Sequence, residues 1–132
     1  MTPESINLQL AKVPFFRFLD FKITEYDDGT VAAVLPFADR LVGNSVKEYY
    51  HGGIIASFME AVASIAVSFA PLPPPKPVNV TVDYLRPGVR GPLMGRATIS
   101  RKGKRLASVR TVSWQDDESR PVAEGLYHFL MV

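Results

Sequence analysis

The sequence contains no cysteine and only two histidines among its 132 residues. Without cysteine the chain can form no disulfide, no thiolate zinc site and no cysteine nucleophile. The absence of cysteine suits a reducing compartment. His51 and His128 are 77 residues apart and form no metal-ligand motif. We therefore expect neither a structural nor a catalytic metal.

We also expect neither a targeting segment nor a membrane span. The first eighteen residues lack the basic and apolar regions of a secretory signal peptide, so we expect a cytoplasmic protein. The nearly apolar segment 54–70 has 17 residues, the lower limit for crossing a bilayer. Glu60, near its middle, would be costly in hydrocarbon. We therefore expect no membrane span and no membrane partner.

Apolar residues make up 47% of the chain and charged residues 21%, enough for one core. We expect a single domain spanning residues 1–132. The net charge of +2 is spread unevenly. Residues 83–110 contain eight Lys or Arg and one acid, whereas the remainder contains seven bases and twelve acids. This basic band indicates either an anionic partner or a solvated strand face.

One segment is predicted to form a long helix, and most of the remainder to form strands. Residues 52–70 contain one charge and no proline, and their apolar residues would lie on nearly every side of a helix. Five prolines between residues 71 and 77 end this helix. We also predict a short helix at 4–12, an irregular segment at 38–50, and strands at 17–27, 30–37, 78–86, 93–100, 104–115 and 121–130. Short connections favour antiparallel pairing, so the expected fold is α+β, a curled antiparallel sheet of about six strands around one central helix.

Glu60 is the only charged residue in the predicted helix 52–70. A buried carboxylate without a partner is costly, so it indicates either a function or a satisfied ion pair. At 100° per residue, one narrow polar stripe contains Ser57, Glu60, Ser64 and Ser68. Serine hydroxyls or a neighbouring arginine would satisfy Glu60 if the residue were only structural.

His51, Gly52 and Gly53 directly precede or begin the same helix. The first N–H groups of a helix lack intrahelical partners, and the dipole adds partial positive charge. These groups can polarise a carbonyl as an oxyanion hole, or the glycines can simply form a tight turn. Glu60 would lie roughly 12 Å along the helix from Gly52, too far to act on the same carbonyl within one chain. A two-fold dimer would bring Gly52 of one chain near Glu60 of the other.

Three stretches together resemble a known family. They are HGGIIASFMEAVASIA (51–66), VTVDYLRPGVRG (80–91) and RATISRKGKRLASVRTVSWQDDESRPVAEG (96–125). The chain resembles hot-dog-fold acyl-CoA thioesterases of the phenylacetate-degradation (PaaI-like) branch over roughly residues 15 to 130. The resemblance implies hydrolysis of an acyl-CoA thioester to a free acid and CoA, without a metal or other cofactor.

The resemblance also implies catalytic roles. Glu60 corresponds to the catalytic acid contributed by the opposite subunit, acting as general base or as nucleophile. Gly52 corresponds to the backbone N–H that polarises the thioester carbonyl, and His51 to a histidine that assists there. Ser64 corresponds to a residue that positions the water or the carboxylate. Gly53 would let the substrate approach the backbone closely.

The sequence departs from the family pattern ahead of the histidine. Many members have Asn or Gln six residues before it, where this chain has Ser45, with Asn44 one position earlier. Either Asn44 or Ser45 would then supply the polar group at the site. The phosphates of CoA would bind at the basic turn formed by Arg101, Lys102, Lys104 and Arg105. Apolar side chains on the helix (Phe58, Met59 and Val62) would line a groove for the acyl group.

Several alternatives stay open. The functional unit implied by the family is a homodimer or a homotetramer built from two dimers. The main rival function is a non-catalytic acyl-CoA-binding or regulatory module on the same fold. A hydratase or dehydratase fits the helix signature poorly. Nucleic-acid binding by the basic band is disfavoured because only Tyr84 and Trp114 are available nearby for stacking.

Overall fold

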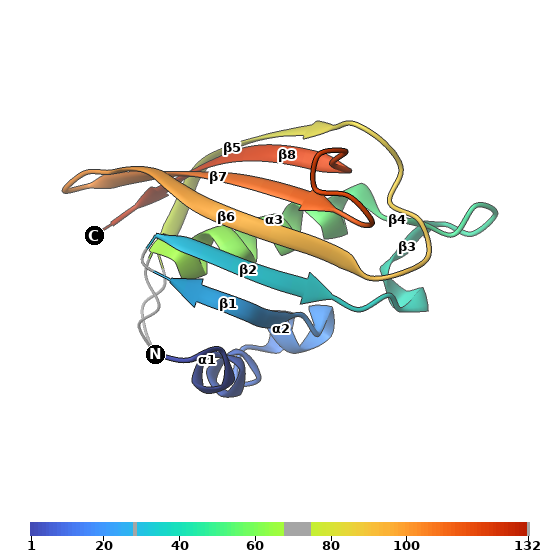
Figure 1. Ribbon diagram of the computed structural model, residues 1–132, viewed down its shortest axis with the longest axis horizontal. Helices are drawn as coiled ribbons and strands as arrows, with labels where there is room; N and C mark the ends of the chain where they lie inside the picture. Colours follow the sequence, from blue (N-terminus) through green and yellow to red (C-terminus); the bar gives the residue numbers. More distant parts are fainter. Residues whose placement is uncertain (28, 68–74, 132) are drawn as a thin grey trace.

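The computed structural model describes residues 1–27, 29–67 and 75–131. Its main sheet has six antiparallel strands in the order β1-β2-β6-β7-β8-β5, curled around one long helix, α3 (Gly52–Val67) (Figure 1). The strands are β1 (Lys22–Asp27), β2 (Thr30–Leu35), β5 (Lys76–Tyr84), β6 (Leu93–Lys102), β7 (Leu106–Trp114) and β8 (Ala123–Leu130). The α+β architecture expected from the sequence is confirmed.

Shorter elements lie before and between these strands. They are the helices α1 (Pro3–Leu10) and α2 (Pro14–Leu19), the 3-10 turn η1 (Asp39–Leu41), and a separate pair of strands, β3 (Val42–Asn44) and β4 (Tyr49–Tyr50). Helix α1 packs against β1, at the edge of the main sheet farthest from β5 (Figure 1). Among the described helices, none is long and apolar enough to cross a membrane.

Two predictions from the sequence are wrong in detail. The strand expected at 17–27 begins only at Lys22, because Pro14 starts a helix that ends at Asp20 in the left-handed conformation (φ 64°). The segment 38–50 is not irregular throughout, since it contains η1 and the β3–β4 pair. The predicted helical residues 68–70, Ser68 included, and residues 71–74 of the proline segment lie outside the described residues.

Helix α3 lies close to the sheet because small residues face it. A Cβ added to Gly95 on β6 would come within 2.9 Å of the Phe58 ring. A Cβ added to Gly125 on β8 would come within 3.1 Å of the Met59 methyl group. Phe58 and Met59 are both fully buried, which stabilises the fold by roughly 1.5–3 kcal/mol each. The glycines therefore set the distance between helix and sheet.

Strand β5 is an edge strand of the sheet, and α3 covers it only in part. The closest packing of α3 is against β2, β6, β7 and β8. The register places Val80 and Tyr84 of β5 opposite Tyr127 and Ala123 of β8, on the inner face of the sheet. Val80 is nevertheless 46% exposed and Tyr84 is 54% exposed. Helix α3 thus leaves part of the inner face of β5 uncovered.

Candidate active site

His51 caps the N-terminus of α3. Its N–H donates to the Leu41 carbonyl (2.8 Å), and its own carbonyl accepts from the N–H groups of Ile54 (3.0 Å) and Ile55 (3.2 Å). Its ring atom Nδ1 accepts a hydrogen bond from the Gly53 N–H (2.9 Å). A neutral imidazole that accepts at Nδ1 carries its proton on Nε2. The exposed His51 ring therefore offers one N–H donor beside the first turn of the helix.

Gly52 provides a second donor at the same place. Its N–H has no acceptor in the described part of the chain, as expected for the first residue of a helix. Its carbonyl accepts a hydrogen bond from the Tyr84 hydroxyl (2.8 Å). A Cβ on Gly52 would lie 3.4 Å from the Tyr84 ring, so the ring covers the Gly52 Cα. An unpaired N–H at the positive end of a helix, next to an imidazole N–H, can stabilise an oxyanion.

Glu60 lies half-buried on α3. Burial removes water from its carboxylate and raises its pKa above the ordinary glutamate value. No ion pair or hydrogen bond to this carboxylate forms within residues 1–27, 29–67 and 75–131. The buried Tyr127 lies near enough that the Glu60 charge adds to the rise in the pKa of the Tyr127 hydroxyl, which is due mainly to burial. Glu60 is thus a basic carboxylate without a structural partner in these residues.

Two serines share the exposed side of α3 with Glu60. Ser57 and Ser64 are both half-buried, as the predicted polar stripe requires. The Ser64 hydroxyl donates to the Ala61 carbonyl (2.8 Å), so it is turned toward the helix backbone and not toward Glu60. Its lone pairs still allow it to accept a hydrogen bond from water.

Asn44 and Ser45 form no hydrogen bond to His51 within the described residues. The Asn44 side-chain oxygen accepts from the N–H groups of Val46 (3.0 Å) and Lys47 (3.1 Å), which folds it into its own turn. Ser45 is exposed in the β3–β4 connection. Gly43 is the β3 residue that lies against His51, since a Cβ there would come within 2.7 Å of the His51 Cα.

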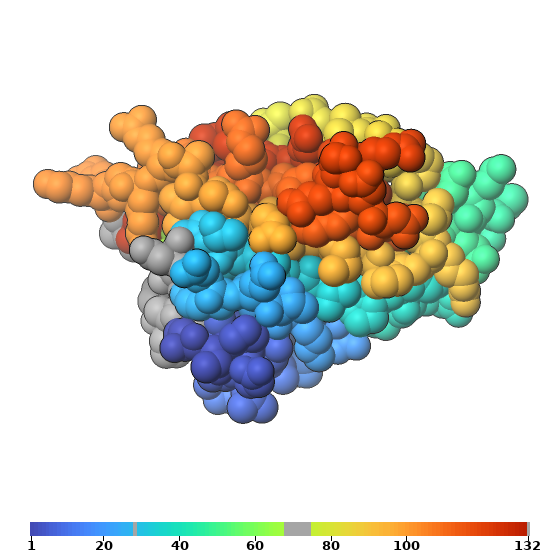
Figure 2. All heavy atoms as spheres, viewed as in Figure 1, coloured from blue at the N-terminus to red at the C-terminus, as the bar shows by residue number. Residues whose placement is uncertain are grey.

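The basic turn between β6 and β7 lies at the other end of α3 from Gly52. The Lys102 ammonium donates to the carbonyl of Val67, the last residue of α3 (3.2 Å). A helix of 16 residues is roughly 24 Å long, so the turn cannot reach the Gly52 N–H within one chain. Figure 2 shows this hairpin (orange) projecting from one end of the molecule. Its cations Arg101, Lys104 and Arg105 are exposed.

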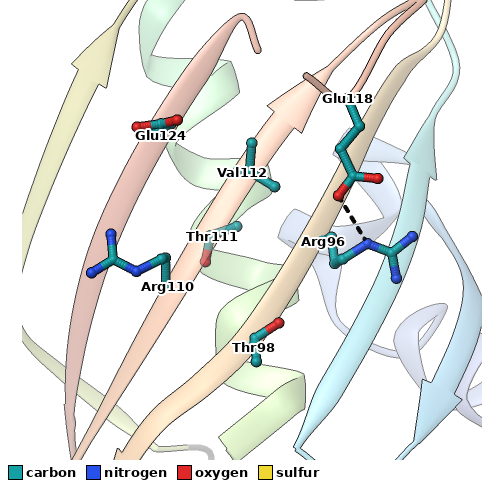
Figure 3. Close-up of a pocket in the computed structure, with 7 residues that line it drawn as sticks. All are labelled: Arg96, Thr98, Arg110, Thr111, Val112, Glu118 and Glu124. Atoms are coloured by element: carbon teal, nitrogen blue, oxygen red, sulfur yellow. Dashed lines mark hydrogen bonds and ion pairs between the residues drawn. The ribbon is translucent and has the colours of Figure 1, made fainter. Parts of the chain in front are cut away.

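Part of the basic band is neutralised by acids. Arg96, on the outer face of the sheet, pairs with Glu25 (3.1 Å). It also pairs with Glu118 (3.2 Å), as Figure 3 shows. Arg90 pairs with Glu48 (2.8 Å). These ion pairs hold Arg90 and Arg96 beside loops and strand ends, whereas Arg101, Lys104 and Arg105 of the β6–β7 turn are exposed and form no ion pair within the described residues.

The prediction that Phe58, Met59 and Val62 line an acyl groove is wrong. Phe58, Met59 and Val62 are fully buried between α3 and the sheet, so they line no open surface. The apolar side chains left uncovered beside α3 belong to β5, notably Val80 and Tyr84. Sequence reasoning missed Tyr84 as a site residue. Its position inside the YLRPG motif was a signal, but its contact with Gly52 depends on the β5–β8 register.

A family profile identifies the class of protein. The profile described as the acyl-CoA thioesterase N-terminal domain matches residues 44–130, which include the whole of α3. The chain therefore belongs to this family of thioester hydrolases, as the resemblance in its sequence implied.

Relatives with known sequences agree with this membership. A protein of Halobacterium salinarum is 31% identical over 119 residues, covering 82% of this chain and 78% of its own length. A medium/long-chain acyl-CoA thioesterase of Salmonella typhimurium is 23% identical over 121 residues, covering 80% of this chain and 78% of its own length.

Solved structures identify the fold. Zebrafish thioesterase superfamily member 2 superposes with a TM-score of 0.86 at 18% identity, covering 100% of this chain and 99% of its own. A phenylacetic acid degradation-related protein of Ralstonia eutropha superposes with a TM-score of 0.80 at 20% identity, covering 95% and 97%. The predicted hot-dog fold is confirmed, and it is shared with a protein of the phenylacetate-degradation branch.

Proposed function

We propose that this protein hydrolyses an acyl-CoA thioester to a free acid and CoA, as a single domain whose active site is shared between two subunits. The observation that carries the proposal concerns α3: within the described residues, the Gly52 N–H at its start has no acceptor and the half-buried Glu60 carboxylate has no partner. Family membership supports the thioester as substrate. The lack of cysteine suits the reducing cytoplasm, where we expect the protein to act.

Each group has a defined task in this reaction. Glu60 removes a proton from water while the water oxygen attacks the carbonyl carbon. The carbonyl oxygen becomes negative and accepts hydrogen bonds from the Gly52 N–H and the His51 Nε2–H. Collapse of the tetrahedral intermediate breaks the C–S bond, and CoA leaves as a thiolate that takes up a proton. Alternatively, Glu60 attacks the carbonyl itself, and water hydrolyses the resulting mixed anhydride. Ser64 would help to hold the water.

The shared site follows from distance. Glu60 is eight positions after Gly52, or roughly 12 Å along the helix, so the two cannot meet one carbonyl in a single chain. Strand β5 supports a second copy as the source of the missing group. Among the described strands it pairs only with β8, and it exposes Val78 and Val80 beside its free edge. Two-fold pairing of β5 with β5 would cover this edge in a homodimer, from which a homotetramer could also be built.

The substrate class is argued from charge and from relatives. The exposed cations Arg101, Lys104 and Arg105 suit the phosphates of CoA, with Lys102 beside them. Because they lie at the far end of α3 from Gly52, we infer that one subunit holds the phosphates while its partner provides the oxyanion hole. The Salmonella relative is named for medium and long acyl-CoA chains, which supports a CoA ester here.

A subunit-mixing experiment tests both the reaction and the shared site. Glu60→Gln removes the base, and Gly52→Pro removes the backbone donor while suiting the first position of a helix. Each variant alone should be inactive on a panel from acetyl-CoA to palmitoyl-CoA that includes benzoyl-CoA and phenylacetyl-CoA, with release of free thiol as the readout. A refolded equal mixture should recover about a quarter of wild-type activity, because half of the dimers regain one of two sites.

Two outcomes would contradict the proposal. Wild-type turnover by Glu60→Gln excludes this carboxylate as the reacting group. A mixture that stays inactive, although mass spectrometry detects heterodimers, excludes the shared site.

A binding module is the second candidate, because the Asn44 amide is folded into its own turn and away from His51. That function predicts that CoA esters raise the melting temperature of the wild type but are not turned over.

A further inference from the structure

Tyr84 connects the edge strand to the first turn of α3. It is the last residue of β5, and its hydroxyl donates to the Gly52 carbonyl (2.8 Å). Its ring lies against Gly52, where a Cβ would be 3.4 Å away. More than half of Tyr84 is exposed, so the contact contributes little to the core. A large aromatic side chain that contacts Gly52 from an exposed strand calls for an explanation other than stability.

The hydrogen bonds around Gly52 indicate what the contact does. The Gly52–Gly53 peptide is held at both ends, its oxygen by the Tyr84 hydroxyl and its N–H by the His51 Nδ1. Two consecutive glycines have weak conformational preferences of their own. These two side-chain bonds therefore add to the bonds of the first helical turn in fixing the orientation of this peptide. It also sets the position of the His51 ring and of the adjacent Gly52 N–H.

We propose that Tyr84 is a positioning residue that fixes the first turn of α3, so that the Gly52 N–H and the His51 Nε2–H face the same carbonyl oxygen. This inference rests on the proposed function and deepens it. Because Tyr84 belongs to β5, it also ties the geometry of the oxyanion hole to the strand that we expect to form the subunit interface. A shift of β5 would move the Tyr84 hydroxyl away from Gly52. The Gly52 N–H and the His51 Nε2–H would then be held less firmly in their orientation.

The test compares two tyrosine-to-phenylalanine variants. Tyr84→Phe keeps the ring and removes the bond to Gly52. Tyr50→Phe is the matched control, because the Tyr50 hydroxyl also donates to a backbone carbonyl, that of Gly91 (2.6 Å) and not that of Gly52. Donors that are held less firmly should stabilise the oxyanion less well, which should lower kcat of Tyr84→Phe roughly three- to tenfold, with KM changed less than about twofold. The Tyr50→Phe variant should lose thermal stability but keep its kcat.

A second measurement does not depend on activity. Hydrogen exchange of the Gly53 amide, followed by NMR, should become at least about threefold faster in Tyr84→Phe than in wild type. It should stay at the wild-type rate in Tyr50→Phe. This readout applies even if no acyl-CoA is turned over, so failure of the proposed function and failure of this inference can be told apart.

Either of two results would overturn the inference. One is an unchanged kcat and an unchanged Gly53 exchange rate in Tyr84→Phe. The other is an equal loss in both variants, which would indicate a general loss of stability. If the wild type is inactive, the Gly53 exchange rate alone decides. Equal exchange rates in the two variants would then reject the role of Tyr84.

Discussion

At the scale of single residues, Glu60 shows how burial and reactivity are linked. Its carboxylate is half-buried and has no hydrogen-bond or ion-pair partner within the described residues. Burial raises the pKa of this group, so the folded protein binds a proton at Glu60 more tightly than the unfolded chain does. The same loss of water makes the carboxylate a better base near neutral pH.

Replacing Glu60 with Gln should therefore stabilise the protein at neutral pH. A raised pKa in the folded state means that stability falls as pH rises from the unfolded value, near 4.5, through the folded one. The melting temperature of Glu60→Gln should exceed that of wild type at pH 7, and the difference should vanish below pH 4.5. Thermal denaturation at several pH values measures this. Ser57→Ala, on the same face of α3, is the control that should show no such pH dependence. A lower melting temperature for Glu60→Gln at pH 7 would show that the charged form has a partner.

At the scale of elements, α3 is fitted to the sheet by glycines. Gly95→Ala would place a methyl group within 2.9 Å of the buried Phe58 ring. Crowding of this kind should lower the free energy of unfolding by about 1–3 kcal/mol, measured by urea denaturation. Combining it with Phe58→Leu should cost less than the sum of the two single changes, because the smaller side chain makes room. Strict additivity would mean that the methyl group is accommodated elsewhere.

Lys102 stabilises the C-terminal end of α3. Its ammonium donates to the carbonyl of Val67, where the helix dipole is negative. Lys102→Met should lower the free energy of unfolding by about 0.5–1 kcal/mol in urea denaturation. The exposed neighbour Lys104 is the matched control, and Lys104→Met should leave stability unchanged while weakening binding of CoA. Equal stability losses in the two variants would contradict a specific role for Lys102 at the helix end.

The elements that could be predicted from the sequence are those with strong local patterns. The helix starting at Gly52 and the strands β2, β6, β7 and β8 follow from apolar periodicity and turn residues. Helix α2 was missed because its aromatic residues also fit an alternating strand pattern, and Pro14 at its first turn decides between the two. The β3–β4 pair was missed because its strands are too short to show a period.

The candidate site was predictable only in part. Local motifs are enough to identify His51, Gly52 and Glu60, and helix geometry alone predicts that Gly52 and Glu60 are too far apart in one chain. The contact of Tyr84 with Gly52 depends on which strand lies beside β8 and in which register, and neither is encoded locally. The burial of the expected groove residues likewise depends on which side of α3 meets the sheet.

At the scale of the whole molecule, the two edges of the sheet differ. The β1 edge is packed against α1, whereas β5 has a free backbone edge and exposed valines within the described chain. An uncovered edge with apolar side chains is a typical pairing surface between chains. We therefore expect the assembly to use β5 and to leave β1 free.

Val80→Lys tests this arrangement. A charge on the inner face of β5 should raise the dimer dissociation constant at least about a hundredfold and abolish turnover, without loss of the circular dichroism spectrum. Sedimentation velocity over a concentration series measures the association. Leu8→Lys, on exposed helix α1 beside the opposite edge, is the control that should remain a dimer. An active, dimeric Val80→Lys would place the interface elsewhere.

The order of the strands also has a consequence for folding. Strand β5 comes directly before β6 in the sequence but pairs in the described sheet only with β8, about forty residues further on. During synthesis, β5 therefore cannot pair within the sheet until β8 has been made. The surface that we expect to join two subunits is therefore completed only when the C-terminal strand is in place. A growing chain that still lacks β8 then has no paired β5 edge through which to associate, so association requires β8.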